Sequence, residues 1–555
     1  MKKSESSAGA VKCKRFAVGG ISLSPDVEEG RACDVVATEL SRAGINPARL
    51  RFDIYKRSVD ARKKKDVRLV YSVAVSSESE IDLSRLSGIK GQVTPIRDEE
   101  PQWSFGSERT EHPPLVVGMG PAGLFCALAL AENGYRPVII DRGDGVLERC
   151  KKTEVFFGEG ELDPESNVQF GAGGAGTFSD GKLVTRVGDA RVNYILRRFC
   201  DFGAPEDITV SAKPHIGTDL LVGVVERMLC RIEELGGRVI YRCRLESFEE
   251  RTDGSIRAVT SRGELLCSGL VMATGHSARD IYTLLMNEQF AVEAKPFSLG
   301  VRIEHLQSDI DKALLGDFAG HPRLGRGEYH LSDTTTGRGV YTFCMCPGGQ
   351  VVAAASEKGG VVVNGMSKRA RDGRNANSAV LVSVRPEDYG NSPMRAIELQ
   401  RRLEREAFKQ AGEDYYAPCQ TVGDFLSGRL ESEPSRVMPT YRDGKVRPVR
   451  LDKLLPSFVS EELAMGLRSF DKKIAGFGAK DAVLTGVETR SSAPVRILRD
   501  SKCAAVGHDR VYPCGEGAGY AGGITSAAID GLRVAEAYME RFDRPCREGK
   551  ELTEL

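Results

Sequence analysis

Apolar and polar positions near the N-terminus alternate in short runs that surround one helical period. This pattern predicts strands at 16–23, 50–57 and 67–75 and an amphipathic helix at 27–43. A polar stretch without periodicity follows at 97–112, and we expect it to be a linker. The first part of the chain is therefore predicted to be a small α+β unit.

A different pattern begins near residue 114. A short apolar run at 115–117 is followed by an apolar helical pattern and by a second strand at 137–140. Helices are predicted at 192–202 and 217–234. Short strands are expected at 238–244, 257–260 and 270–274. The resulting alternation of strands and helices along the chain is typical of α/β folds.

From about 290 to 475 the pattern changes to short strand-like runs separated by glycine turns, with a helical stretch near 395–411. Residues 511–543 then return to strand, glycine turn and helix. The predicted fold class is α/β, with a Rossmann-like three-layer FAD-binding domain, an inserted α+β, β-rich cap domain and a small N-terminal α+β domain. The predicted domains are 1–105 (N-terminal domain with linker), 106–290 (FAD-binding domain, first part), 291–475 (cap) and 476–555 (FAD-binding domain, C-terminal part).

The stretch LVVGMGPAGLFCALALAENGYRPVIIDR, residues 115–142, carries the strongest functional signal. Gly118 permits a sharp turn, Gly120 lets a pyrophosphate approach the backbone, and Gly123 lets the helix pack closely on the strand. The helix N-terminus offers free N–H groups to phosphates. Asp141, at the end of the second strand, can accept a hydrogen bond from a ribose 2′-OH. This is the dinucleotide-binding fingerprint in its expected context.

Composition excludes several function classes. The 555 residues carry zero formal net charge, which gives no electrostatic case for nucleic acid or membrane partners. No apolar run approaches the roughly 18 residues of a membrane span. The 14 cysteines are scattered without a C-x-x-C motif, which favours reduced thiols and a cytoplasmic location. No metal site is predicted.

Three further glycine-rich segments favour FAD over NAD as the ligand. They are VQFGAGGAGTFSDGKL at 168–183, LVMATGH at 270–276, and VYPCGEGAGYAGGITSAAIDG at 511–531. Glycines let backbone lie flat against a ligand, and a helix N-terminus can face the flavin edge that becomes negative on reduction. The predicted cofactor-binding residues are Gly118, Gly120, Pro121, Ala122, Gly123, Asp141, Arg142, Gly173, Gly174, Thr177, Ser179, Asp180, Lys182, Ala273, Thr274, Gly275, Gly515, Glu516, Gly523 and Ile524.

These motifs give the chain a resemblance to a known family. It resembles the bacterial and plastid uncharacterised FAD-dependent dehydrogenases, NAD(P)/FAD-dependent oxidoreductases distantly akin to fumarate reductase and BaiN-like flavoproteins. Segments that carry the resemblance include ESNVQFGAGGAGTFSDGKL, AKPFSLGVRIEH, GRGVYTFCMCPGGQVVAAASE and YPCGEGAGYAGGITSAAIDG. The resemblance implies an extended FAD and an active site between the FAD-binding and inserted domains. It does not imply a substrate.

Flavin chemistry also needs a proton donor or acceptor near N5. Candidate catalytic residues are Glu488, Arg490, His276 and Arg302. Arg302 and Glu304 share one strand face, as do Glu488 and Arg490, so each pair is also readable as a structural ion pair. Arg490 could hold a substrate carboxylate, because its planar fork suits bidentate contact. His276 is equally explained as a capping or packed side chain.

Four other residues are weaker candidates. Cys344 and Cys346 flank one residue in a strand-like run, so both are expected to point the same way. They are either two packed thiols or a thiol that faces the flavin. His215 and Cys514 carry no specific support beyond their neighbouring motifs.

The preferred function is an FAD-dependent oxidoreductase that moves a hydride between a small-molecule substrate and flavin N5. NAD(P)H is a possible electron donor, and an electron-donor protein is a possible partner. The alternative is a flavin-binding RNA-modification or assembly factor that docks a macromolecule through its N-terminal domain. The basic turn at 62–65 would serve that alternative, although a solvated hairpin explains the turn equally well.

Overall fold

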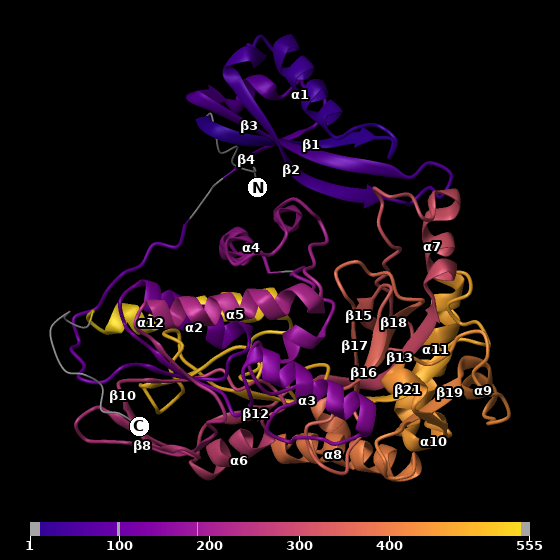
Figure 1. Ribbon diagram of the computed structural model, residues 1–555. Helices are drawn as coiled ribbons and strands as arrows, with labels where there is room; N and C mark the ends of the chain where they lie inside the picture. The colour runs from indigo at the N-terminus through magenta and orange to yellow at the C-terminus, as the bar shows by residue number, and fades with distance from the viewer. Residues whose placement is uncertain (1–11, 97–99, 186, 545–555) are drawn as a thin grey trace, which may run out of the picture.

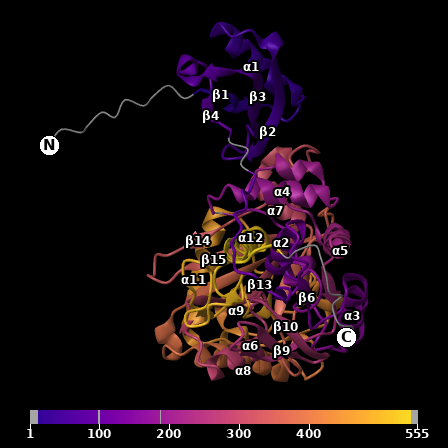
Figure 2. The same cartoon turned by 90° about the vertical axis from the view of Figure 1, so that its left-hand side faces the viewer.

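An antiparallel sheet with one helix forms the N-terminal domain in the computed structural model, which describes residues 12–96, 100–185 and 187–544. Its strand order is β2-β3-β1-β4. The elements are β1 (Lys12–Leu23), α1 (Gly30–Arg42), β2 (Leu50–Asp60), β3 (Arg68–Asp82) and β4 (Gln92–Pro95). Helix α1 buries Ala32, Val36 and Leu40, one face of a 3.6-residue period, against the sheet. The domain stands apart from the main body in Figures 1 and 2.

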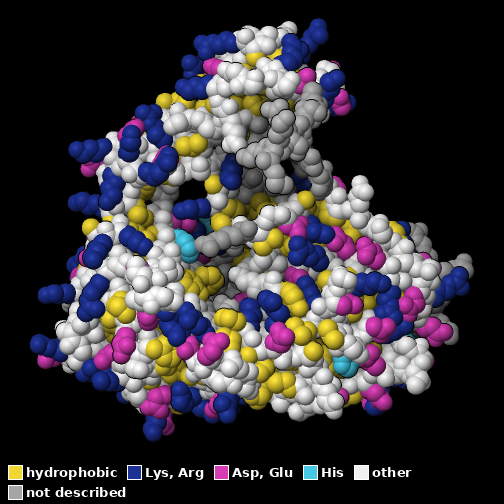
Figure 3. All heavy atoms as spheres, turned by 180° about the vertical axis from the view of Figure 1, so that it is seen from behind, with side chains coloured by type: hydrophobic (Ala, Val, Ile, Leu, Met, Phe, Trp, Pro, Cys, Tyr) yellow, Lys and Arg dark blue, Asp and Glu magenta, His cyan; other side chains and the backbone are white. Residues whose placement is uncertain are grey.

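The N-terminal domain contacts the main body through few points. Arg57 of β2 exchanges backbone hydrogen bonds with Val210 and Ala212, at 2.7 and 2.8 Å. Leu315 and Leu324 of the main body join its hydrophobic core. The space-filling view from behind shows the surface hollowed between the two parts (Figure 3).

Five parallel strands form the central sheet of the main body, in the order β23-β11-β5-β6-β7. They are β5 (Leu115–Val117), β6 (Val138–Ile140), β7 (Arg238–Ile240), β11 (Leu270–Met272) and β23 (Val511–Pro513). Strand β7 ends at Ile240, so the strand predicted at 238–244 is shorter than expected. Strand β23 comes from the far end of the chain and pairs with β11 at one edge of the sheet.

The two faces of this sheet are covered differently. Val116, Ile139 and Val271 face the helices α2 (Pro121–Glu132), α5 (Thr218–Glu234) and α12 (Ile524–Arg541). Alternate residues such as Leu115 and Ile140 face the meander β8 (Leu245–Glu250), β9 (Ile256–Thr260) and β10 (Gly263–Cys267). Because successive side chains of a strand point to opposite faces, the sheet packs against helices on one side and against the meander on the other. This gives three layers, and the fold is mixed α/β as predicted.

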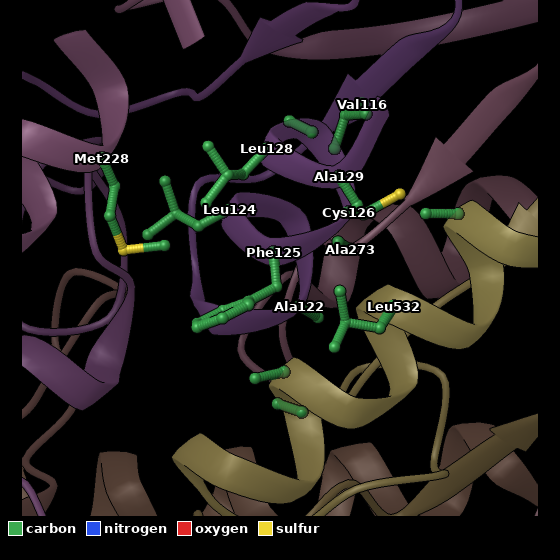
Figure 4. Packing of buried hydrophobic residues seen from close by; sticks show 14 of the residues in the cluster. Val116, Ala122, Leu124, Phe125, Cys126, Leu128, Ala129, Met228, Ala273 and Leu532 are labelled. Carbon is green, nitrogen blue, oxygen red and sulfur yellow. The ribbon is translucent and has the colours of Figure 1, made fainter. Parts of the chain in front are cut away.

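Helix α2 is the core of the helical layer. Every residue from Ala122 to Ala131 is buried, because α5 and α12 pack on it from two sides (Figure 4). A Cβ at Gly531 of α12 would lie 2.1 Å from Ala122 O, so this glycine allows the two helices to touch. Tight packing here holds the N-terminus of α2 in a fixed position at the carboxyl end of β5.

A second sheet of seven strands follows, in the order β14-β15-β18-β13-β21-β19-β20. Its strands are β13 (Phe297–Leu306), β14 (Ser332–Asp333), β15 (Val340–Cys346), β18 (Asn375–Val384), β19 (Ala417–Thr421), β20 (Val446–Pro448) and β21 (Val483–Glu488). All neighbours are antiparallel except β19 and β20. Strand β21 lies beyond residue 475 and pairs with β13 and β19, so it belongs to this sheet, and the predicted domain boundaries stay a prediction.

Further elements connect and cover the two sheets. They are α3 (Val146–Glu159), α4 (Arg191–Asp201), α6 (Arg279–Asn287), α7 (Gln307–Leu315), α8 (Pro393–Gln410), α9 (Val422–Ser427), α10 (Leu451–Leu454), α11 (Ser457–Lys473), β12 (Val292–Ala294), β16 (Gln350–Ala353), β17 (Val363–Met366) and β22 (Val495–Ile497). Within the described ranges, the helices are all too short or too polar to cross a membrane.

Candidate cofactor cavity and active site

A cavity of about 1300 Å³ lies between the carboxyl ends of the parallel strands and the second sheet. One wall comes from the turn after β5, the glycine-rich loop around Gly174 and the segment after β11. The opposite wall comes from β15 and the end of β21. Ligands of open α/β sheets bind at this edge of the strands.

The turn after β5 needs two of its glycines for packing and leaves the third open. Gly118 has φ +104°, and a Cβ there would lie 2.3 Å from Ala273 O. A Cβ at Gly123 would lie 1.9 Å from Gly118 O. At Gly120 a Cβ would meet only Gly174 Cα, at 3.8 Å, among the described atoms within 4 Å. Gly120 therefore lines the cavity and keeps the N-terminus of α2 accessible to a pyrophosphate.

Asp141 ties three loops of the cavity wall together. Its carboxylate accepts hydrogen bonds from the backbone N–H groups of Met119, Gly143 and Gly171, each at 2.9 Å. A carboxylate has about four acceptor sites, so a ribose hydroxyl could use the remaining one. Asp141 lines the cavity, and its three hydrogen bonds to backbone N–H groups hold the loops in place.

Arg149 is a buried residue that no sequence motif singles out. Its guanidinium donates to the carbonyls of Asn167, Val168, Gly171 and Ala172 at 2.7–3.2 Å. Burial lowers its pKa to about 10. The side chain supplies donors to four carbonyls of the glycine-rich loop, which contains no strand.

The glycine-rich loop divides into residues that face the cavity and residues that do not. Ser179 and Lys182 line the cavity. Asp180 is fully buried, and its carboxylate pairs with Arg371. It is not among the residues that line the cavity, so the structure places it behind the wall, and its role as a cofactor contact stays a prediction. Arg142 lines the cavity, but it is paired with Glu165 at 2.9 Å.

His276 and Glu516 meet where the segments after β11 and β23 approach each other. His276 Nδ1 lies 3.4 Å from Glu516 Oε1, and both residues line the cavity. Burial lowers the pKa of His276 to about 4, so the imidazole is neutral at pH 7. Its Nε2 is buried with no hydrogen-bond partner among the described residues. Burial raises the pKa of Glu516 to about 7.

The two arginines predicted to act in catalysis are held by carboxylates. Arg490 pairs with Glu404 through two nitrogens, at 2.8 and 3.1 Å. Glu404 also pairs with Arg279 at 2.7 Å, and these neighbours hold the pKa of its carboxyl well below its usual range. Arg490 borders the cavity, but its fork is occupied, which argues against its predicted role as a carboxylate clamp.

Arg302 is fully buried behind the cavity and supports Glu488. Its guanidinium lies 2.8 and 3.1 Å from the Glu488 carboxylate oxygens and 2.7 Å from Asn377 Oδ1. Burial nevertheless raises the pKa of Glu488 to about 7, and Glu488 lines the cavity. The predicted pair Arg302–Glu304 is not formed, because Glu304 instead accepts from Thr440 and Asn375.

Among the weaker candidates, only Cys344 lines the cavity. Cys514 is buried beside Cys126, and burial raises its pKa. His215 Nε2 lies 3.3 Å from Arg369 O, outside the cavity.

Most of the predicted cofactor residues do line this cavity. Those that line it are Gly118, Gly120, Pro121, Ala122, Asp141, Arg142, Gly174, Ser179, Lys182, Ala273, Thr274, Gly275, Glu516, Gly523 and Ile524. Gly123, Gly173, Thr177, Asp180 and Gly515 lie behind it, where they shape the loops. For example, a Cβ at Gly173 would lie 2.0 Å from Thr177 Oγ1. In the described part of the chain, no cluster of three His, Cys, Asp or Glu side chains is arranged to hold a metal ion.

Known proteins match two parts of the chain. Residues 296–491 match a family described as FAD-dependent protein, C-terminal domain-like. Residues 21–76 match a domain of unknown function. The first match spans the strands of the second sheet, from β13 to β21.

Solved structures such as the following two are only weakly similar to this chain. The halogenase PltM is 11% identical, with a TM-score of 0.37, over 78% of this chain and 72% of its own. NikD, described as an unusual amino acid oxidase essential for nikkomycin biosynthesis, is 11% identical, with a TM-score of 0.31, over 78% and 94%. At such scores they carry no argument about activity.

A much stronger match is an uncharacterised protein of Clostridium beijerinckii (strain ATCC 51743 / NCIMB 8052). It is 47% identical over 501 residues, which cover 89% of this chain and 93% of that protein. Because of this identity and coverage, the chain belongs to the same family as this uncharacterised protein, and its residues 296–491 match the FAD-dependent protein, C-terminal domain-like family.

Proposed function

We propose that this protein is an FAD-dependent oxidoreductase that moves a hydride between a small-molecule substrate and flavin N5. The observation that carries the proposal is the single cavity that joins the glycine turn after β5 to a wall of buried carboxylates. The turn that would bind the dinucleotide and the carboxylates that would transfer protons therefore line the same cavity.

The residues present fit FAD. Gly120 leaves room at the N-terminus of α2 for the pyrophosphate, and Asp141 keeps an acceptor site for a ribose hydroxyl. At the N-terminus of α12, no described atom lies within 4 Å of a Cβ built at Gly522 or Gly523. This helix can therefore face a bound ring and stabilise negative charge on it.

When bound, FAD supplies a two-electron acceptor for hydride at N5. The chain supplies the binding, the exclusion of water and the proton transfer. Glu488 and Glu516 have pKa values raised by burial to about 7, which is where a general acid or base works best at neutral pH. His276 is neutral, so it serves as a hydrogen-bond partner of Glu516 rather than as a cationic acid.

The electron donor and the natural partner belong to the same proposal. We propose NAD(P)H or an electron-donor protein as the reductant. The alternative of an RNA-modification or assembly factor gains no support from the basic turn, because Arg62 is exposed and paired with Asp60.

An absorption spectrum of the purified protein tests the proposal. We expect bound flavin, identified as FAD by mass after release, that bleaches anaerobically with NADH or NADPH. Bound flavin that stays oxidised would move the search to other reductants. A protein that binds no flavin, even after reconstitution, would overturn the proposal.

A further inference from the structure

Cys344 lies at an irregularity in β15, on the wall of the cavity opposite the cofactor turn. Strands β15 and β18 pair in register up to Phe343 and Ala379, and the register shifts before Cys346 pairs with Asn377. Cys344 has φ +42°, a conformation that costs a non-glycine residue about 1–3 kcal/mol. Strain of this kind gathers at functional sites, where the surrounding structure maintains it.

Cys346 lies directly behind Cys344. Its Sγ donates a hydrogen bond to Cys344 O at 3.3 Å. Arg302 Nη2 lies 3.6 Å from Cys346 Sγ. Both thiols are free, Cys346 is buried, and Cys344 is partly exposed to the cavity. The pair therefore has one sulfur at the cavity wall and one protected behind it.

Two cations from different parts of the chain approach this pair. Arg302 donates to Cys344 O, and Lys182 of the glycine-rich loop donates to Met345 O. The hydrogen bond from Cys346, together with Arg302 and Lys182, lowers the pKa of Cys344. The same hydrogen bond and burial raise the pKa of Cys346. An accessible thiolate next to a protected thiol is the arrangement of reactive dithiols.

The pair also lies close to the proposed acid–base groups. A negative charge on Cys344 raises the pKa of Glu516 and of Glu488, which come from the two opposing walls. Lys182 connects the cofactor loop to the same strand. Cys344 is thus at the meeting point of the two walls.

We propose that Cys344 and Cys346 form a redox-active dithiol that exchanges two electrons with FAD in this cavity. The inference rests on the proposed function, since FAD is the oxidant. In the oxidising direction the S–S bond forms and the S–H bond of Cys346 breaks. The two electrons and that proton pass to FAD, which becomes the reduced anion, and the reverse step regenerates the thiolate and the thiol.

Electron stoichiometry tests the proposal on the flavin-loaded protein. The oxidised protein is titrated anaerobically with dithionite, and flavin absorbance is followed. We expect the wild-type protein to take up about four electrons per flavin, because a disulfide and a flavin each accept two. Cys344→Ser and Cys346→Ser should each take up about two. Cys33→Ser, which removes a half-buried thiol in the N-terminal domain, should behave as wild type.

Peptide mapping gives a readout that does not depend on flavin. The tryptic peptide 339–358 contains both cysteines and no other cysteine. In the oxidised protein we expect this peptide to resist alkylation until it is reduced, whereas the exposed Cys230 reacts throughout.

Wild-type protein that binds flavin but takes up about two electrons, with peptide 339–358 alkylated twice, would overturn the dithiol alone. A protein that never binds flavin would overturn the dithiol exchange together with the proposed function. The two failures are therefore distinguishable.

Discussion

The two walls of the cavity expose different chemical groups, backbone on one side and side chains on the other. The wall next to the parallel sheet is mostly backbone, with glycines at Gly118, Gly120 and Gly174 and helix N-termini that point at the ligand space. The wall next to the second sheet is made of buried charged side chains such as Glu488 and Arg490, and of Cys344. The first wall can bind by shape and dipole and adds one titrating carboxylate, Glu516, whereas the second can transfer protons or electrons through several side chains. Substitutions that affect one wall and spare the other test this division.

The largest effect is expected at the backbone wall. Gly120→Val places a branched side chain where a pyrophosphate would lie, and we expect flavin affinity to fall by more than about a thousandfold, roughly 4 kcal/mol. Flavin content after gel filtration measures it. Gly158→Val, on α3 at a position with no described atom within 4 Å of a built Cβ, is the control and should keep its flavin. A yellow Gly120→Val protein would show that the cofactor lies elsewhere.

The charged wall should depend on Glu404. Glu404→Gln leaves Arg279 and Arg490 buried without their shared carboxylate, and we expect a loss of about 3–5 kcal/mol in the free energy of unfolding. Urea unfolding measures this loss. Glu398→Gln, an exposed change on the same helix α8, should have almost no effect. Equal stability of the two variants would contradict the role given to this network.

Arg149 tests whether a side chain maintains the backbone wall. Arg149→Met leaves buried carbonyls of the glycine-rich loop without a donor, and we expect the free energy of unfolding to fall by about 3 kcal/mol. Flavin binding should weaken as well, because the loop is no longer held. Lys151→Met, exposed on the same helix α3, serves as the reference. A normal flavin affinity in Arg149→Met would mean that the loop holds its shape without this arginine.

The smallest effect is a pH dependence at Glu516. Its folded-state pKa is raised by burial to about 7, so the folded protein binds the proton more tightly than the unfolded chain does. Stability from this group is therefore present below its unfolded pKa, about 4.3, and is lost as pH rises through about 7. The loss should be about 2–3 kcal/mol, given that the side chain is 25% exposed.

Glu516→Gln removes the titration, so its stability relative to wild type should increase between pH 5 and pH 8. Unfolding of flavin-free protein at both pH values measures this difference. A constant difference between the two proteins would show that Glu516 does not titrate in this range.

The backbone wall was largely predictable, and the reason lies in local structure. Gly118, Asp141 and Gly523 sit in strand–turn–helix units whose period and spacing appear within a few dozen residues. Helix α2 and helix α12 were expected at nearly their observed positions for the same reason. Asp180 is one of the five predicted contacts that lie behind the cavity, and nothing near it in the sequence indicates its partner Arg371.

The charged wall could not be predicted in this way. Arg490 meets Glu404, and Arg302 meets Glu488, across separations of 86 and 186 residues. The irregular register at Cys344 also depends on how β15 pairs with β18. Side chains of this kind have many possible partners in the sequence, and only packing selects one.

The sequence by itself determined the α/β class, the glycine-rich turn after β5 and several of the glycines that line the cavity. These features follow from local periodicity and from the steric freedom of glycine, which act within one element or one turn. Tertiary structure decided which charges neutralise each other, which carboxylates remain to titrate near pH 7, and which thiols face the cavity. Those outcomes depend on burial and on contacts between distant segments, because the free energy of a charge is set by what surrounds it in space.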